Sequence, residues 1–240
     1  MTNDTAHVKA DQLTVTFPLR LAGIRNTGSR EQHKALDALN FTLEPGARIG
    51  LLGRNGSGKS TLLRTLAGVY PPTSGTLTVE GRVAAIFNAS LGFVQEATGI
   101  ENIYLRGAML GLSFDEIRAL VPSIVEFSEL GDWVHQPIHR YSSGMSLRLA
   151  FSITTAVRSD ILLLDEWLGA GDAAFLRKAR ARMQSMVEDA RIVVLATHNL
   201  NLMRSQCNQA MVLEEGKLVF MGDLDTAIER YQEFRQLTQL

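Results

Sequence analysis

Apolar residues in this chain gather in short runs that alternate with stretches of helical spacing. Ile49–Leu52, Ile161–Leu164 and Ile192–Ala196 are almost wholly aliphatic. Such runs are typical of parallel strands that helices cover on both faces. Leu13–Phe17 and Leu39–Glu44 instead alternate apolar and polar positions, which predicts strands with one exposed face. The pattern therefore indicates an α/β protein.

A middle region of helical spacing interrupts the strands. From about residue 100 to residue 158 the strand signal fades, and Ser113-x-x-Glu116 has the spacing of a capping box at a helix start. Pro122 predicts a kink or a restart in that helix. The last segment, Leu224–Leu240, again places apolar residues at helical spacing. Additional strands are expected at Thr76–Val79, Val83–Phe87, Ala210–Leu213 and Leu218–Phe220.

Composition and charge narrow the class of protein. The chain has 240 residues, 45% of them hydrophobic, which is enough for one large α/β domain. A formal net charge of −1 gives no overall basic field for nucleic acid. The single cysteine, Cys207, excludes an internal disulfide and a multi-cysteine zinc site, which fits a reducing cytoplasm. No apolar run is long enough to cross a bilayer and the first residues lack the apolar core of a signal peptide, so we expect any work at a membrane to need a partner.

The sequence GRNGSGKS, residues 53–60, follows the first aliphatic run and precedes a helical pattern. It fits the phosphate-binding pattern G-x-x-x-x-G-K-[ST] in the strand–loop–helix context that this pattern requires. Its glycines let backbone N–H groups curl around phosphates, and the helix adds the positive end of its dipole. Lys59 supplies a charge for the phosphates, and the Ser60 hydroxyl is a ligand for Mg²⁺. The sequence therefore predicts a site for a nucleoside triphosphate. The residues expected to line it are Gly53, Arg54, Asn55, Gly56, Ser57, Gly58, Lys59, Ser60 and Thr61.

Two carboxylates follow the second aliphatic run. In ILLLDE, residues 161–166, Asp165 and Glu166 come where a buried strand ends. Open α/β sheets bind ligands at the carboxyl ends of their strands. Asp165 is then placed to hold Mg²⁺ through water, and Glu166 to polarise the water that attacks the γ-phosphate. A strand that ends in two solvated acids is the simpler alternative, which the phosphate loop upstream disfavours.

The segment YSSGM, residues 141–145, indicates the kind of nucleotide-binding protein. It precedes a helical pattern, so Ser142 is expected to cap a helix. Lying between the phosphate loop and the paired acids, it resembles the LSGGQ signature of the ATP-binding-cassette family, with Ser142 and Gly144 at the signature serine and second glycine. Ser143 and Met145 depart from the commonest form. The resemblance implies an ATP-sandwich homodimer, in which the signature of one copy meets the γ-phosphate bound by the other.

Two further positions match that family. Gly171-Asp172 follows the paired acids as the family's D-loop does, which implies that Asp172 crosses the dimer interface; Asp172 can also cap the next helix. Thr197-His198 follows the aliphatic strand at residues 192–196, where the family keeps its switch histidine. The resemblance therefore implies that His198 acts at the γ-phosphate beside Glu166.

Three features stay open in the sequence. Phe17 is the candidate for the aromatic residue that stacks on adenine, but an ordinary packed strand side chain explains it nearly as well. The family's Q-loop glutamine should close the strand at residues 83–87, where Asn88 stands and Gln95 lies further on. Leu19–Lys34 carries several basic residues, and a solvated loop is favoured over a contact with lipid headgroups or a permease.

Three longer segments carry a narrower resemblance, to the ATPase subunit of bacterial polysaccharide exporters. That group moves O-antigen, capsule and teichoic acid chains. The resemblance implies an ATPase with ATP and Mg²⁺ as cofactors, which powers export of a polysaccharide or glycolipid through a polytopic membrane permease at the cytoplasmic face of the inner membrane. Some members carry an extra carbohydrate-binding domain, for which this chain is expected to be too short. The segments are ATGIENIYLRG (97–107), QPIHRYSSGM (136–145) and DEWLGAGDAAF (165–175).

The expected architecture is a P-loop NTPase core of the ABC nucleotide-binding type, with an antiparallel β subdomain and a helical subdomain. We expect residues 1–240 to form one such domain, with the helical subdomain at about 98–158 and a C-terminal helix at about 224–240. Two alternatives remain for its function: a cassette ATPase that transmits conformational force to a membrane partner without transport, and an exporter ATPase for a different substrate. Length and charge disfavour a nucleic-acid-linked cassette, while YSSGM and His198 together disfavour a simple P-loop kinase or GTPase.

Overall fold

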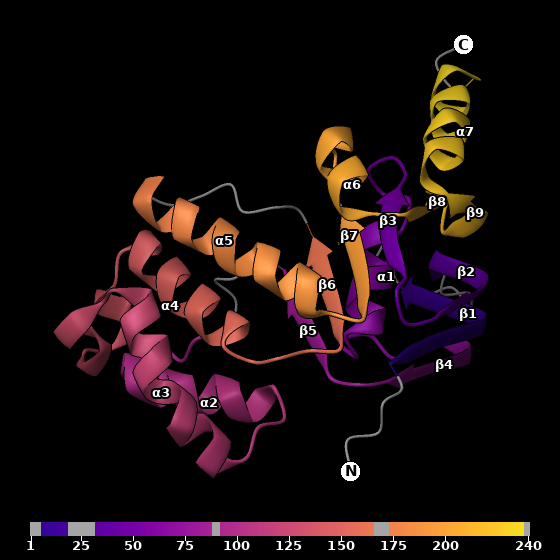
Figure 1. Cartoon of the computed structure of the whole chain (residues 1–240). Helices are drawn as coiled ribbons and strands as arrows, with labels where there is room; N and C mark the ends of the chain where they lie inside the picture. Colours follow the sequence, from indigo (N-terminus) through magenta and orange to yellow (C-terminus); the bar gives the residue numbers. More distant parts are fainter. Residues whose placement is uncertain (1–5, 19–31, 88–91, 166–172, 238–240) are drawn as a thin grey trace, which may run out of the picture.

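The computed structural model describes residues 6–18, 32–87, 92–165 and 173–237, which form two sheets and several helices (Figure 1). The strands are β1 (His7–Pro18), β2 (Gln32–Leu43), β3 (Arg48–Leu52), β4 (Ser74–Glu80), β5 (Val83–Ile86), β6 (Ile161–Asp165), β7 (Ile192–Ala196), β8 (Gln209–Glu214) and β9 (Lys217–Asp223). The helices are α1 (Lys59–Leu66), α2 (Gly99–Met109), α3 (Phe114–Ser128), α4 (Ser143–Thr155), α5 (Ala173–Asp189), α6 (Leu200–Gln206) and α7 (Leu224–Leu237), with 3-10 helices η1 (Gly131–His135) and η2 (Ile138–Arg140).

The larger sheet is the core of the molecule. Its strands lie in the order β5-β6-β7-β3-β8-β9, all parallel except β9, which pairs antiparallel with β8. Strands β6 and β7 are buried on both faces, which explains why their sequences are continuous aliphatic runs. Alternate residues serve opposite faces: Leu163 packs in a cluster with leucines of α1, whereas Leu162 packs in a cluster with residues of α5, α6 and α7.

The smaller sheet covers the α1 side of the core. Its order is β2-β1-β4, all antiparallel, and its inner residues join the hydrophobic cluster that contains the leucines of α1. Helix α1 therefore lies between two sheets. Strands β1 and β2 are longer than the sequence pattern predicts, because left-handed residues such as Gln12 and Ala38 and shifts in register let them bend and continue.

The helices α2, α3 and α4 form a third hydrophobic cluster, which we call the helical layer. Figure 1 shows this layer beyond β5 and β6, on the side away from β3 and α1. The capping box of Ser113 and Glu116 is confirmed at the start of α3. The predicted restart at Pro122 is wrong: α3 runs unbroken through it, because the buried Ile117 and Ile124 hold the turns on either side in the cluster.

Three phenylalanines connect the helical layer to the core. Phe127 of α3, Phe151 of α4 and Phe175 of α5 are buried, with ring centroids 5.9–6.0 Å apart. Lys178 and Arg182 of α5 lie over the Phe127 ring, at 4.6 and 4.3 Å from its centroid. Such contacts add cation–π attraction to the burial of the rings. Among the described helices, none has the length and apolarity needed to cross a bilayer.

Candidate nucleotide site

The carboxyl ends of three neighbouring strands bring the predicted site residues to one edge of the sheet. Asp165, the last residue of β6, is opposite Ala196 of β7, and Ala196 is opposite Leu51 of β3. The phosphate loop begins two residues after Leu51, and His198 follows two residues after Ala196. Neighbouring strands lie about 4.8 Å apart. The structure therefore brings the phosphate loop, Asp165 and His198 together, as the sequence predicts.

Glycines at two positions allow the loop to fold tightly against its surroundings. Gly58, at φ +107°, adopts a left-handed conformation, and a Cβ there would lie 2.6 Å from the carbonyl oxygen of Ala35 in β2. Gly53 approaches the backbone of β8 as closely, since its Cβ would lie 2.5 Å from the Leu213 oxygen. The loop backbone can therefore take this course only with glycine at these positions.

The end of α1 that faces the site carries uncapped amide groups. Gly58 is the N-cap and has no side chain, so no side-chain oxygen accepts from the first-turn N–H groups. Those donors and the positive end of the helix dipole suit a phosphate. The Lys59 ammonium already lies over the loop, donating to the Gly53 oxygen at 2.6 Å and to the Arg54 oxygen at 2.9 Å.

A hairpin turn supports the loop from behind. The N–H of Gly216, between β8 and β9, donates to the Ser57 oxygen at 3.1 Å. The Gly216 oxygen accepts in turn from the Asp37 N–H of β2 at 2.8 Å. Ser57 itself is buried, and its hydroxyl has no hydrogen-bond partner within the described part of the chain. The loop is thus fixed by backbone contacts to both sheets.

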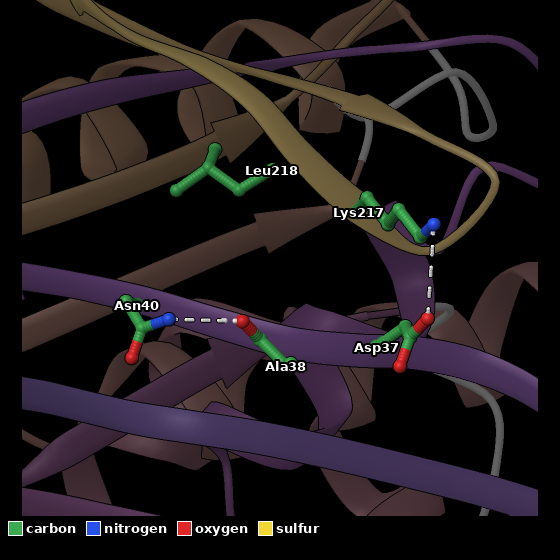
Figure 2. A pocket seen from close by; sticks show the side chains of 5 residues that line it. All are labelled: Asp37, Ala38, Asn40, Lys217 and Leu218. Atoms are coloured by element: carbon green, nitrogen blue, oxygen red, sulfur yellow. Dashed lines mark hydrogen bonds and ion pairs between the residues drawn. The ribbon is translucent and has the colours of Figure 1, made fainter.

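A hollow of about 350 Å³ lies beside this turn, between β2 and β9 (Figure 2). Its polar side chains contact protein groups: Asn40 Nδ2 donates to the Ala38 oxygen at 3.0 Å, and Lys217 Nζ lies 4.0 Å from an Asp37 oxygen. Lys34 also donates to Asp37 at 2.8 Å, and this hydrogen bond holds the pKa of the Asp37 carboxyl below its usual range. The polar groups of the hollow are therefore already engaged with one another.

The donors at the sheet edge fit a magnesium ion. Ser60 and Asp165, both half-buried, offer a hydroxyl and a carboxylate oxygen, which are the ligand types that Mg²⁺ prefers. The described residues contain no cluster of three or more His, Cys, Asp or Glu side chains suited to a metal. Mg²⁺ usually keeps several waters and binds substrate phosphates with only one or two protein groups, so the pair Ser60 and Asp165 suits it. Glu166, Asp172 and Asn88 lie outside the described residues.

The signature segment lies at the start of helix α4, away from the phosphate loop of the same chain. Ser142 is confirmed as the N-cap, since its Oγ accepts from the Met145 N–H at 3.2 Å. Ser142, Ser143 and Gly144 are all exposed. In Figure 1, α4 and α1 lie on opposite sides of β5 and β6, so one chain does not bring its own signature onto its own phosphate loop.

Three other predicted residues have clear surroundings. Phe17 packs on the core cluster of the small sheet and meets the Tyr70 ring edge-on at 5.2 Å. His198 is exposed after β7, and Thr197 before it accepts from the Asn199 N–H. Gln95 lies in the turn before α2, where its carbonyl oxygen accepts from the His139 N–H at 3.0 Å. The packing of Phe17 leaves its role at adenine a prediction.

Asn102 is a residue that the sequence analysis missed. It is fully buried on α2, accepts from the Val94 N–H, and donates to the carbonyl oxygens of Val94, Ala97 and Thr98. It thereby orders the turn that leads into α2. The available signal was a polar residue beside Ile103 on the apolar side of a predicted helix.

Comparisons with known proteins agree with this geometry. The profile of the ABC transporter family matches residues 36–169. An O-antigen export system ATP-binding protein of Yersinia enterocolitica is 44% identical over 80% of this chain and 80% of its own length. A protein of the same description from Myxococcus xanthus is 38% identical over 91% of this chain and 50% of its length, so the chain spans about half of that relative. A teichoic acids export ATP-binding protein of Bacillus anthracis is 38% identical over 85% of this chain and 37% of its length.

Among solved structures, a dimeric ATP-binding cassette in a post-hydrolysis state, bound to ADP and Pi, has a similar fold. It is 22% identical, with a TM-score of 0.68 over 90% of this chain and 98% of that one.

Proposed function

This chain belongs to the ABC transporter family and has its ATP-binding fold, and we propose that it hydrolyses ATP to power export of a polysaccharide or glycolipid through a partner permease. One observation carries the ATPase part: the phosphate loop, Asp165 and His198 meet at the carboxyl ends of three neighbouring parallel strands. The export part is supported by relatives named for O-antigen and teichoic acid export.

Two copies of the chain are proposed to enclose two ATP molecules. The support is that Ser142, Ser143 and Gly144 are exposed at the start of α4, a helix that lies on the opposite side of β5 and β6 from α1. A Cβ at Gly144 would meet only the Ser142 hydroxyl, 3.9 Å away, within the described part of the chain. The start of α4 is therefore open to a second molecule, and a helix N-terminus suits a phosphate. Asp172 is proposed to cross the same interface.

Each residue at the sheet edge has a separate proposed role in ATP hydrolysis. Lys59 and the loop amides hold the phosphates, and Ser60 and Asp165 would hold Mg²⁺, which neutralises charge on the β- and γ-phosphate oxygens. Glu166 is proposed to orient the attacking water and accept its proton, and His198 to contact the γ-phosphate. Arg54, Asn55, Gly56 and Thr61 complete the loop around the nucleotide, while Phe17 is proposed to stack on adenine.

An exposed apolar surface on the helical layer is proposed to contact the permease. Leu105 and Met109 of α2 and Phe114 of α3 are 45%, 78% and 65% exposed. We call these three residues the α2–α3 patch. Large apolar side chains that gather on a surface are typical of interaction sites. Through this patch, movement of the helical layer on ATP binding would reach the membrane partner, which would hold the chain at the cytoplasmic face of the inner membrane.

The test is an affinity purification of the tagged Glu166→Gln protein from detergent-solubilised native membranes with ATP, followed by mass spectrometry. We expect a stoichiometric polytopic membrane protein, with glycolipid retained. Met109→Glu should reduce its recovery, whereas Val69→Glu, at an exposed apolar residue outside the patch, should leave it unchanged. A single-span partner, or recovery without any membrane protein, would contradict export and favour transmission of force without transport.

The ATPase part is tested separately on the purified chain. Lys59→Ala should weaken ATP binding because the ammonium group nearest the loop is lost. Glu166→Gln should bind ATP normally but hydrolyse it very slowly and accumulate as an ATP-bound dimer. Full turnover by Glu166→Gln would remove Glu166 from its role, and normal ATP affinity of Lys59→Ala would contradict the nucleotide site itself.

A further inference from the structure

The segment that precedes the signature is bound to the segment that leads into α2. The Ile138 N–H donates to the Ala97 oxygen at 3.0 Å, and the Gly99 N–H donates to the Gln136 oxygen at 3.2 Å. His139 contacts the Gln95 oxygen twice, through its N–H at 3.0 Å and its ring Nδ1 at 3.1 Å. Residues 95–99 and 136–139 therefore behave as one short paired unit, although about forty residues separate them in sequence.

Tyr141 extends this pairing to the signature. Its hydroxyl donates to the Trp133 oxygen at 2.7 Å, and Tyr141 is followed directly by the N-cap Ser142. Its ring reaches the first residue of α2: a Cβ at Gly99 would lie 2.4 Å from the Tyr141 oxygen. Burial raises the pKa of this phenol from its ordinary value of 10 to about 12, and at either value the hydroxyl is a donor at physiological pH.

We propose that Tyr141 is a positioning residue for the ATP sandwich: its hydroxyl fixes the signature to η1 and to the start of α2, so that Ser142 and Gly144 arrive at the partner's phosphate in a defined orientation. The proposal rests on the two-copy arrangement proposed above. Tyr141 stands where the common signature LSGGQ has a leucine. A leucine has no hydroxyl and could not make this hydrogen bond.

The contacts of the Tyr141 hydroxyl predict that its loss affects dimerisation more than folding. The Trp133 oxygen also accepts from the Gln136 N–H at 2.9 Å, so it keeps a hydrogen bond when the phenol hydroxyl is removed. The Tyr141 ring would still fill its place in the cluster of the helical layer. Tyr141→Phe should therefore fold, yet let the tip of α4 vary in orientation. Each sandwich holds two signatures, so the loss counts twice in the dimer.

The experiment measures ATP-dependent dimerisation of Glu166→Gln by analytical ultracentrifugation, with and without Tyr141→Phe. Tyr141→Phe should raise the ATP concentration needed for half-maximal dimer about tenfold, because two signature segments that the hydroxyl holds in the parent chain must be ordered when the variant dimerises. Binding of ATP to the monomeric chain, measured with Lys59→Ala as the non-binding reference, should not change. Tyr104→Phe is the matched control, since Tyr104 lies on α2 and its ring stacks on Phe114.

The outcomes separate this inference from the proposed function. If Glu166→Gln does not dimerise with ATP, the two-copy arrangement itself is wrong. If Glu166→Gln dimerises and Tyr141→Phe leaves the ATP dependence unchanged, the positioning role of Tyr141 is wrong. Gly99→Ala provides a second variant, because its Cβ would displace the Tyr141 hydroxyl and would also press on the Val134 oxygen, 2.9 Å away. In protein that circular dichroism shows to be folded, it should weaken dimerisation in the same direction, and a normal dimer would contradict the role of the Tyr141 hydroxyl.

Discussion

Two serines three positions apart on the phosphate loop have opposite surroundings. Ser57 is 4% exposed and its hydroxyl has no hydrogen-bond partner in the described part of the chain, whereas Ser60 is half-buried in the first turn of α1 at the site. A buried hydroxyl that lacks a partner has lost its hydration without compensation. A serine hydroxyl is thus destabilising at position 57, whereas at position 60 it is a proposed ligand for Mg²⁺.

Ser57→Ala should leave the free energy of unfolding unchanged or raise it by about 1 kcal/mol, because an uncompensated hydroxyl is removed. Denaturant unfolding monitored by circular dichroism measures this change. Ser60→Ala is the contrast: it should retain stability and lose Mg²⁺-dependent ATP hydrolysis. A clear loss of stability in Ser57→Ala would show that its hydroxyl makes a contact.

Gly58→Ala should destabilise the protein by about 1–3 kcal/mol and abolish nucleotide binding, because alanine is strained at φ +107° and its Cβ would meet the Ala35 oxygen. Thermal unfolding and ATP titration measure the two effects. Gly56→Ala is a graded control: it also has a positive φ, +84°, but a Cβ there meets no atom within 4 Å in the described structure. It should be the milder variant, and equal damage at both positions would refute the steric argument.

At the scale of single residues, the sequence predicts much of the candidate nucleotide site. The motifs GRNGSGKS, ILLLDE and Thr197-His198 each stand at the end of a predicted strand. Parallel strands bring those ends to one edge of the sheet. The support of Ser57 by Gly216 and the pairing of Gln95 with His139 were not predictable, because they join backbone groups far apart in sequence. No local pattern of side chains encodes such contacts.

Two helices of the helical layer, α2 and α3, begin at capping boxes. Thr98 with Glu101 opens α2, and Ser113 with Glu116 opens α3, each as a complete capping box. In both boxes the first cause of a lowered glutamate pKa is the hydrogen bond from the N-cap backbone N–H. Only the second box was predicted, although Thr98-x-x-Glu101 has the same spacing in the sequence.

The caps predict how the stability of this layer depends on pH. Because folding lowers the pKa of Glu101 and Glu116, their contribution is present above the ordinary value of 4.5 and is lost as pH falls through the lower folded values. The double variant Glu101→Gln, Glu116→Gln should therefore show a smaller loss of thermal stability between pH 6 and about pH 3 than the parent chain. Glu126→Gln, at an exposed position of α3 outside the cap, should not change the slope. Equal slopes in all three proteins would contradict the role of the caps.

On the scale of the whole molecule, three aromatic rings help to join the helical layer to the core. Phe127, Phe151 and Phe175 belong to three different helices, and Lys178 donates to the carbonyl oxygen of Phe127 and, with Arg148, pairs with Glu129 at the end of α3. The layer itself was predicted from helical spacing. The rings that join it to the core were not, because nothing in the local sequence shows that they meet.

Phe127→Leu should lower the free energy of unfolding by about 2 kcal/mol, because it loses ring contacts and two cation–π contacts at a buried position. Denaturant unfolding measures the loss. Phe114→Leu, at a position that is 65% exposed, makes the same chemical change with little burial and should cost far less. Similar losses in the two variants would show that the three rings do not hold the layer to the core.

The position of β3 has a consequence for how the protein is made. This strand carries the phosphate loop and lies inside the sheet, but both of its neighbours come late in the chain: Arg48 is opposite Val193 of β7, and Ile49 is opposite Gln209 of β8. A ribosome must therefore synthesise the chain through β7 and β8 before β3 has both of its neighbours, and non-local pairing of this kind is slow. Until then the nascent chain has its phosphate-loop sequence but no sheet edge to hold it, so nucleotide recognition begins only after β7 and β8 have been synthesised.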